Sequence, residues 1–208
     1  MAQHHTWAVV PVKRLSGAKS RLAGVMGQAE REAFCLDMLD DVLAALGRTP
    51  GLAGTLVVTA DGQAATHARA AGARVIDDGA GAGLNAALDS TVTALVFGQA
   101  GRLLVLPADV PLVTPDSLAP LLAAAAGVTL VPDRAGTGTN ALLMAPVGAL
   151  PFRFGPSSLA RHREEAAARG LPVRVLEIPE LALDIDTPDD LNALLAMRAA
   201  GGTARRRA

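Results

Sequence analysis

The chain reads Arg-Leu-Leu-Val-Leu-Pro-Ala-Asp-Val-Pro-Leu from Arg102 to Leu112, where an apolar run ends in one carboxylate between two prolines. Leu103–Leu106 is too short for a helix and apolar on both faces, which is typical of a central parallel strand covered by helices. The first proline lacks a backbone donor and therefore ends the strand. Asp109 could cap the next helix, but Thr114 already provides that cap. Because ligands in open α/β sheets bind at the carboxyl ends of the strands, we expect Asp109 to bind a metal or another ligand.

The composition limits the classes of function. The chain has 208 residues, which is enough for one domain with a buried core. Only 2% of the residues are aromatic and the net charge is −1, so we expect no surface for nucleic acid. The single cysteine, Cys35, excludes an intramolecular disulfide and a zinc site made of cysteines alone. The apolar runs are shorter than the roughly 18 residues that span a bilayer, and we expect a cytoplasmic protein that binds no membrane.

Strands and helices alternate along the chain, which is the pattern of an α/β fold. The expected strands cover residues 7–12, 55–60, 73–76, 103–106, 128–131, 141–145 and 173–178. The expected helices cover residues 28–47, 64–71, 84–97 and 116–126, followed by one that starts near Ser157 and one from Pro188 to Met197. We expect a single domain over residues 1–198 and a disordered tail over residues 199–208.

The loop after the first strand concentrates positive charge. Of the 19 Lys and Arg residues in the chain only two are lysines, and both lie in this loop, at Lys13 and Lys19, together with Arg14 and Arg21. Compact ammonium groups suit phosphoryl oxygens, which favours phosphate binding over an ordinary solvated basic loop. The Gly-x-x-x-x-Gly-Lys-Ser/Thr spacing of a Walker loop is absent.

Two carboxylates near the end of the chain, Asp184 and Asp186, stand two residues apart just before a helix that Thr187 is expected to cap. Residues two apart in an extended segment face the same side, so both carboxylates would point together. A cation relieves their repulsion, and a hard ion such as Mg²⁺ prefers oxygen ligands. The alternative is a polar turn on the surface. Because Asp109 also calls for a partner, we favour a Mg²⁺ site.

Two helix starts could bind a ligand. A glycine-rich loop over residues 77–83 leads to Asn85, whose amide could pair with a base edge, although a flexible connector is the commoner role of such a loop. Ser157 and Ser158 open a later helix, where they could be ordinary caps or could receive an anion together with free N–H groups. His162 on that helix is expected on an exposed face and is assigned no role.

Seven motifs follow one another along the chain, and their order is more specific than any one of them. They are Pro11-Val-Lys13, Ala18-Lys-Ser-Arg-Leu22, Leu84-Asn85, Asp109, Asp133-Arg-Ala-Gly-Thr-Gly-Thr139, Phe154-Gly-Pro-Ser-Ser-Leu-Ala-Arg-His162 and Asp184-Ile-Asp-Thr-Pro188. Over nearly the whole chain they resemble the guanylyltransferases of the deazaflavin coenzyme F-420 pathway. The resemblance implies a nucleotidyltransferase-like, Rossmann-like three-layer sandwich with a mixed, mostly parallel central sheet. It also implies transfer of GMP from GTP to the phosphate of phosphoenolpyruvate or 2-phospholactate, with release of pyrophosphate.

The same resemblance assigns roles to individual residues. It implies Mg²⁺ as cofactor, held by Asp109, Asp184 and Asp186. The GTP phosphates would be held by Lys13, Lys19 and Arg21, which would act in catalysis with Asp109, and Asn85 would lie near the guanosine. The pocket for phosphoenolpyruvate would consist of Thr139, Gly155 and Ser158.

Several alternatives stay open at this point. Phosphoenolpyruvate, 2-phospholactate and 3-phosphoglycerate differ by few atoms, and only a composition typical of GC-rich bacteria favours the first. Rival interpretations are a nucleotidyltransferase with a larger acceptor, such as a molybdenum-cofactor guanylyltransferase, and a nucleotide-binding module without turnover. The retained aspartates and lysines count against the second rival. The sequence leaves the oligomeric state and a nucleotide contact of Asp61 undecided.

Overall fold

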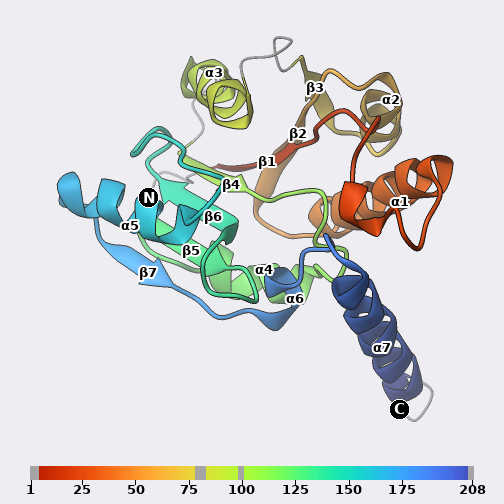
Figure 1. The fold of residues 1–208 in the computed structure, drawn as a ribbon. Helices are drawn as coiled ribbons and strands as arrows, with labels where there is room; N and C mark the ends of the chain where they lie inside the picture. The colour runs from red at the N-terminus through yellow and green to blue at the C-terminus, as the bar shows by residue number, and fades with distance from the viewer. Residues whose placement is uncertain (1–4, 78–82, 98–100, 206–208) are drawn as a thin grey trace.

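The structure is a computed structural model that describes residues 5–77, 83–97 and 101–205. One seven-stranded sheet forms the middle layer, and helices cover both of its faces (Figure 1). Most of the glycine-rich loop predicted at residues 77–83, and the end of the predicted tail at residues 206–208, lie outside the described residues. The α/β class predicted from the alternating pattern is confirmed.

The strands follow in the order β3-β2-β1-β4-β6-β5-β7 across the sheet. Every strand predicted from an apolar run is present, and the observed ends differ from the predicted ones by a few residues. Along the chain the strands are β1 (Thr6–Pro11), β2 (Leu52–Val58), β3 (Arg74–Ile76), β4 (Arg102–Val105), β5 (Gly127–Pro132), β6 (Thr139–Ala145) and β7 (Val173–Val175).

Two helices begin where their capping residues predict, whereas the short helix at residues 179–182 was not predicted. Thr114 Oγ1 accepts a hydrogen bond from Ser117 N at 3.1 Å, and Asp190 Oδ2 accepts one from Thr187 N at 2.9 Å. The helices are the 3₁₀ turn η1 (Ser20–Leu22), α1 (Gln28–Gly47), α2 (Gly62–Ala70), α3 (Leu84–Phe97), α4 (Pro115–Leu122), α5 (Ser158–Ala168), α6 (Pro179–Ala182) and α7 (Pro188–Arg205). Within the described part of the chain, none of them is long and apolar enough to cross a membrane.

The last helix is longer than the sequence predicts. α7 continues past Met197 to Arg205, so residues 199–205 are helical where a disordered tail was expected. Once a helix is nucleated by its cap, each further residue adds a hydrogen bond at little cost, and alanine and arginine are good helix formers. The two glycines at 201 and 202 do not end the helix.

All strands run parallel except β6, which is antiparallel to both of its neighbours. Val105 at the end of β4 pairs with Leu142 of β6, and Pro132 at the end of β5 pairs with Thr139. The start of β6 therefore lies at the edge of the sheet where β4 and β5 end.

Alternate residues of the central strands enter two separate cores. Val10 and Leu104 pack in the core under α1, α2 and α4, whereas Val9 and Leu103 pack in the core under α3 and α5. β4 is thus buried on both faces, as its apolar run predicts. Figure 1 shows the same division, with α1 and α2 on one side of the strands and α3 and α5 on the other.

Candidate active site

The loops that follow β1 and β4 lie next to each other, because these strands are neighbours in the sheet. The chain goes from β1 to β2 on one side, whereas β4 pairs on the other side, so the strand order reverses between β1 and β4. Such a reversal opens a crevice outside the carboxyl ends of the strands. The two loops bring Lys19 and Asp109 to this crevice.

Lys19 is the centre of the cluster of charged side chains in the crevice. Its Nζ donates to Asp109 Oδ2 at 2.6 Å and to Asp186 Oδ1 at 2.8 Å. The side chain is only 10% exposed. This burial alone would lower its pKa, but the charges and hydrogen bonds of the two carboxylates outweigh it and raise the pKa of Lys19. The ammonium group is therefore charged at neutral pH. Lys19, which was predicted to bind phosphate, is thus ion-paired with Asp109 and Asp186, two of the residues predicted to bind Mg²⁺.

The backbone of Lys19 is also unusual. Its φ of 51° lies in the left-handed region, which residues other than glycine adopt at a cost. Among the described non-glycine residues, only Lys19 and Ser157 have positive φ. Both belong to loops predicted to bind phosphate groups, and conformations of this kind cluster at functional sites.

Asp61 holds the loop that carries Lys19 in place through a hydrogen bond to its backbone. Leu15 N donates to Asp61 Oδ2 at 3.0 Å, while Asp61 Oδ1 accepts from the first backbone N–H groups of α2. Partial burial would raise the pKa of Asp61, but these backbone donors lower it below its ordinary value. The carboxylate of Asp61 is thus used to position the basic loop.

Arg21 and Lys13, two further cations of the basic loop, are more exposed than Lys19. The guanidinium of Arg21 lies 4.0 Å from Asp186 Oδ2, and its side chain is 72% exposed. Lys13, just beyond β1, is exposed as well. Both side chains are therefore accessible to an anion from the solvent, and Arg21 lies near the carboxylate of Asp186.

Asp184 joins the cluster through the backbone. Ile185 N donates to the backbone oxygen of Asp109 at 3.1 Å, which ties this extended segment to the loop after β4. Asn140 Nδ2 donates to Asp184 Oδ1 at 3.1 Å. Burial, together with the negative charges of Asp109 and Asp186, raises the pKa of Asp184 against the opposing effect of the Asn140 hydrogen bond. The three predicted metal ligands therefore share one region of negative charge.

The chemistry of these carboxylates fits Mg²⁺. Among the described residues, no group of three or more His, Cys, Asp or Glu side chains is placed so that it could hold a metal ion. Mg²⁺ is commonly bound by one or two carboxylates that are completed by substrate phosphates and water. Asp109 and Asp186, which already share one cation, would supply such a pair, with Asp184 beside them.

The amide of Asn85, which was predicted to lie near the guanosine, is hydrogen-bonded within the protein. Its Nδ2 donates to Phe154 O at 3.2 Å, and its Oδ1 accepts from Phe154 N at 2.9 Å. A carboxamide can pair with a peptide group through the same donor and acceptor that a base edge would use. In the structure this pair is already engaged, and it fastens the start of α3 to the segment before Gly155.

Thr139 is buried at the start of β6, where its Oγ1 lies 3.1 Å from His162 Nδ1. Arg153 N donates to His162 Nε2 at 3.0 Å, so Nε2 is the acceptor and Nδ1 carries the proton that is donated to Thr139. Burial, assisted by the charges of Arg161 and Arg153, lowers the pKa of His162 to about 4. The ring is therefore neutral at physiological pH.

The position of His162 corrects the expectation of an exposed residue without a role. The side chain is 0% exposed. Its neighbours Ser158 and Ala166, one turn away on each side, are also buried, so His162 lies on the inner face of α5. The helical spacing Ser158-His162-Ala166 was the signal in the sequence that could have shown this.

Gly155 and Ser158 shape the start of α5. Gly155 has a φ of 115°, which favours glycine, and its backbone oxygen accepts from Ser158 N at 3.1 Å. Leu159 N donates to Thr137 O at 3.1 Å, which joins this turn to the loop before β6. The structure thus brings Thr139, Gly155 and Ser158 together around the start of one helix.

Sequence reasoning missed Asn140 as a positioning residue. Its Nδ2 donates to the backbone oxygens of Leu181 and Ala182 as well as to Asp184. Asn140 is the only amide in an otherwise apolar strand, but its partners lie about forty residues away in the chain. A buried polar residue that starts an apolar strand is the sequence signal for such a role.

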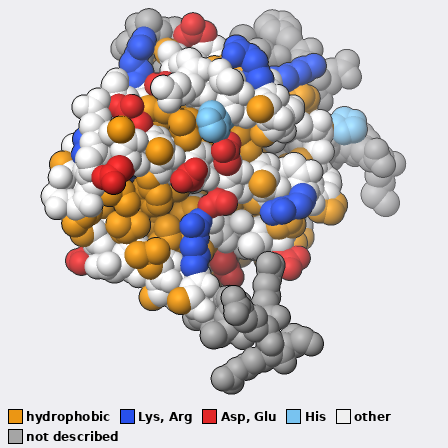
Figure 2. All heavy atoms as spheres, turned by 90° about the vertical axis from the view of Figure 1, so that its right-hand side faces the viewer, with side chains coloured by type: hydrophobic (Ala, Val, Ile, Leu, Met, Phe, Trp, Pro, Cys, Tyr) orange, Lys and Arg blue, Asp and Glu red, His pale blue; other side chains and the backbone are white. Residues whose placement is uncertain are grey.

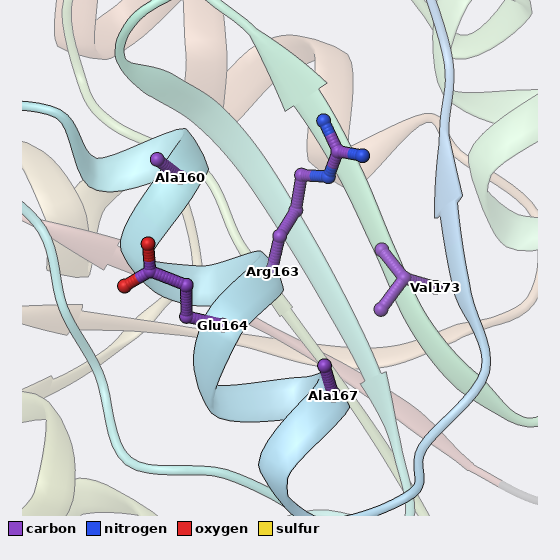
Figure 3. A pocket seen from close by; sticks show the side chains of 5 residues that line it. All are labelled: Ala160, Arg163, Glu164, Ala167 and Val173. Atoms are coloured by element: carbon purple, nitrogen blue, oxygen red, sulfur yellow. The ribbon is translucent and has the colours of Figure 1, made fainter.

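A groove on the far side of α5 is separate from this region. It has a volume of about 460 Å³ and is lined by Ala160, Arg163, Glu164, Ala167 and Val173, from α5 and β7 (Figure 3). None of the predicted site residues lines it.

On the face of the molecule shown in Figure 2, acidic and basic side chains lie among one another, and the described residues form no broad basic patch there, in keeping with the net charge of −1.

Comparison with known proteins agrees with the fold and the motifs. Residues 6–206 match the family model described as "Guanylyl transferase CofC like". The phosphoenolpyruvate guanylyltransferase of Rubrobacter xylanophilus is 47% identical over 193 residues, which cover 91% of this chain and 93% of that protein. The protein of the same name from Conexibacter woesei is 44% identical, over 97% of this chain and 93% of that protein.

Solved structures similar to this chain include proteins named as nucleotidyl or cytidylyl transferases. A nucleotidyl transferase from Methanothermobacter superposes with a TM-score of 0.66 at 19% identity, over 91% of this chain and 95% of that one. A CMP:2-keto-3-deoxy-manno-octonic acid synthetase complexed with CTP gives a TM-score of 0.62 at 16% identity, over 95% of this chain and 99% of that one. At these identities the likeness shows the nucleotidyltransferase fold alone, and it confirms the predicted fold class.

Proposed function

The chain belongs to the CofC-like guanylyl transferase family, and we propose that it transfers GMP from GTP to the phosphate of phosphoenolpyruvate in the synthesis of the deazaflavin coenzyme F-420. The observation that carries this proposal is the cluster of Lys19, Asp109 and Asp186 in the crevice between β1 and β4. It joins a cation with carboxylates that suit a metal ion at the place where α/β sheets bind nucleotides. The names of the curated relatives supply the acceptor.

In the proposed reaction, an oxygen of the acceptor phosphate attacks the α-phosphorus of GTP. The bond between the α-phosphorus and the bridging oxygen breaks, and pyrophosphate leaves with the electron pair. No covalent bond to the protein is formed. Both reactants are anions, so the protein has to align them and neutralise their charge.

The residues of the basic loop would bind the phosphates and neutralise their charge. Lys13 and Arg21 are exposed at the crevice and would bind the triphosphate. Lys19 would neutralise phosphate oxygens from its buried position beside the carboxylates. Mg²⁺, bound by Asp109 and Asp186 with Asp184 close by, would supply charge neutralisation on the phosphates and stabilise the departing pyrophosphate.

The acceptor would occupy the pocket at the start of α5. His162 donates to Thr139 Oγ1, so the hydrogen of this hydroxyl group is available to a phosphate oxygen. Gly155 and Ser158 would add a close backbone approach and a second hydroxyl. Thr139 lies at the same edge of the sheet as the ends of β4 and β5, because β6 runs antiparallel and starts there.

The test is release of pyrophosphate from GTP and Mg²⁺ with phosphoenolpyruvate, 2-phospholactate or 3-phosphoglycerate, followed by mass spectrometry of the products. We expect release that depends on phosphoenolpyruvate and a product with the mass of its guanylyl adduct. Asp109→Asn should reduce kcat about a hundredfold or more, whereas Asp189→Asn, at an exposed aspartate in the first turn of α7, should not.

Other outcomes would lead to different functions. Release with only a larger phosphorylated acceptor would favour an enzyme such as a molybdenum-cofactor guanylyltransferase. Binding of GTP without turnover of any acceptor, and equally strong binding by Asp109→Asn, would favour a nucleotide-binding module. Either result would overturn the proposed reaction.

A further inference from the structure

Arg161 holds a buried polar atom that the fold does not satisfy. Its Nε is the buried side-chain nitrogen or oxygen that lacks a hydrogen-bond partner among the described residues. On the same edge of the guanidinium, Nη2 has a contact of 3.5 Å with Phe154 O, at the limit for a hydrogen bond. A buried donor without a partner costs free energy, so an atom of this kind in a native fold calls for an explanation.

The positively charged guanidinium of Arg161 lies beside uncharged residues. It follows Ser158 by one turn on α5, and residues three apart on a helix are neighbours. A Cβ atom added to Gly155 would lie 3.3 Å from Nη2, so the guanidinium reaches the turn at Gly155. Its neighbour His162 is held neutral and bonded to Thr139. The cation therefore lies against Gly155 and one helical turn from Ser158, two of the three residues of the predicted acceptor pocket, while the third, Thr139, is bonded to the adjacent His162.

Glu165, which follows Arg161 by one turn on α5, is already paired with two other arginines. Glu165 accepts from Arg153 Nε at 2.7 Å and is ion-paired with Arg169. Arg161 thus keeps an edge with two N–H donors, of which one is unpaired and one weakly engaged. A planar edge of this kind matches the two oxygens of a carboxylate.

We propose that Arg161 binds the carboxylate of the acceptor through Nε and Nη2, while Thr139, Gly155 and Ser158 bind its phosphate. This inference rests on the proposed function, in which the acceptor is a three-carbon acid with a phosphate on the carbon next to its carboxylate. Nη2 leaves the backbone oxygen of Phe154 when the acid enters, since their 3.5 Å contact is at the limit for a hydrogen bond. Arg161 then selects phospho-acids over phosphate esters that lack a carboxylate.

The first measurement compares two arginines of α5. Arg161→Met should raise KM for phosphoenolpyruvate about tenfold or more and leave KM for GTP within about twofold. Arg163→Met removes the same side chain from the groove on the far side of the helix, where Figure 3 shows it, and should leave both values within about twofold. An equal rise of both KM values in Arg161→Met would contradict the proposal.

The second measurement separates binding from a structural role. Isopropenyl phosphate has the skeleton of phosphoenolpyruvate with a methyl group in place of the carboxylate. In the wild type, we expect kcat/KM to fall about a hundredfold or more from phosphoenolpyruvate to isopropenyl phosphate, whereas in Arg161→Met the same change should cost about threefold or less. A structural role would lower activity with both compounds and leave their ratio as in the wild type, which would overturn the inference.

Two further outcomes are distinct. If the wild type turns over neither phosphoenolpyruvate nor 2-phospholactate, the proposed function fails and this inference fails with it. If Arg161→Met does not fold, Arg161→Lys keeps the charge without the planar edge and is compared in the same way. The ratio of its kcat/KM values for the acid and for the analogue without a carboxylate should lie below the wild-type ratio. An unchanged ratio would overturn the inference.

Discussion

His162 shows how one side chain can be set by its surroundings. Arg153 N occupies one ring nitrogen and Thr139 Oγ1 the other, so the buried ring is held in one tautomer. A charged ring would have to keep a proton on Nε2, where Arg153 N already donates. The neutral form is therefore built into the fold, and it fixes the hydroxyl group of Thr139 as a donor toward the acceptor pocket.

This arrangement predicts how stability depends on pH. The folded pKa of about 4 lies below the value of 6.5 for a free histidine, so below pH 6.5 the unfolded chain binds a proton that the native state does not. The stabilising contribution is complete above pH 6.5 and is lost at up to about 1.4 kcal/mol per pH unit as the pH falls toward 4. His162→Gln should be less stable than the wild type at pH 7.5, and the difference should shrink below pH 6.5. Urea unfolding of both proteins at several pH values measures it, and a constant difference would contradict the prediction.

The segment between β6 and α5 is held by hydrogen bonds to two other parts of the chain. Asn85 at the start of α3 pairs with the backbone of Phe154, and Thr137 before β6 accepts from Leu159 N. These bonds fix the approach of the chain to Gly155. A residue expected to contact the nucleotide thus acts on the element that forms the predicted acceptor pocket.

Replacement of Asn85 separates the two roles. Asn85→Ala removes both bonds to Phe154, and we expect the free energy of unfolding to fall by about 1–3 kcal/mol. KM for phosphoenolpyruvate should rise several-fold while KM for GTP changes less. Asn192→Ala, at an exposed amide of α7, should alter stability by about 0.5 kcal/mol or less. A rise in KM for GTP alone would instead favour the predicted contact with the guanosine.

At the scale of the whole molecule, the charged cluster exists only when distant parts of the chain come together. Lys19 is 90 residues from Asp109 and 167 residues from Asp186. These segments are joined by the pairing of β1 with β4 and by the backbone bond from Ile185 to Asp109. A ligand of the cluster therefore binds the native state and not the unfolded chain, so it stabilises the fold.

We expect this stabilisation to require the metal ion. At GTP concentrations about a hundredfold above Kd with Mg²⁺ present, the native state should gain about 2.7 kcal/mol, or about 5–10 °C in Tm. EDTA should remove most of the gain, because three carboxylates then repel the triphosphate. Thermal unfolding with GTP, with and without the chelator, tests this. An equal shift in both conditions would show that the cations of the chain bind GTP without a metal.

Local patterns in the sequence predicted the elements well. The apolar runs located all seven strands, and the caps at Thr114 and Thr187 located two helix starts, since periodicity and capping act within a few residues. The position of Asp109 after a doubly buried strand also placed it at the ligand-binding edge of the sheet. The end of α7 was missed because a helix that has started continues through residues with little preference against it.

By itself, the sequence determined the α/β class, the strand that delivers Asp109 and the charged residue types available for a phosphate and a metal. Only the tertiary structure decided which groups face each other: Lys19 with Asp109 and Asp186, Asn85 with Phe154, and His162 with Thr139. It also decided that β6 runs antiparallel, which brings Thr139 to the same edge as Asp109. The physical reason is that an element forms from interactions between near neighbours in the chain, whereas a side chain's partner is set by strand order and helix packing across the molecule.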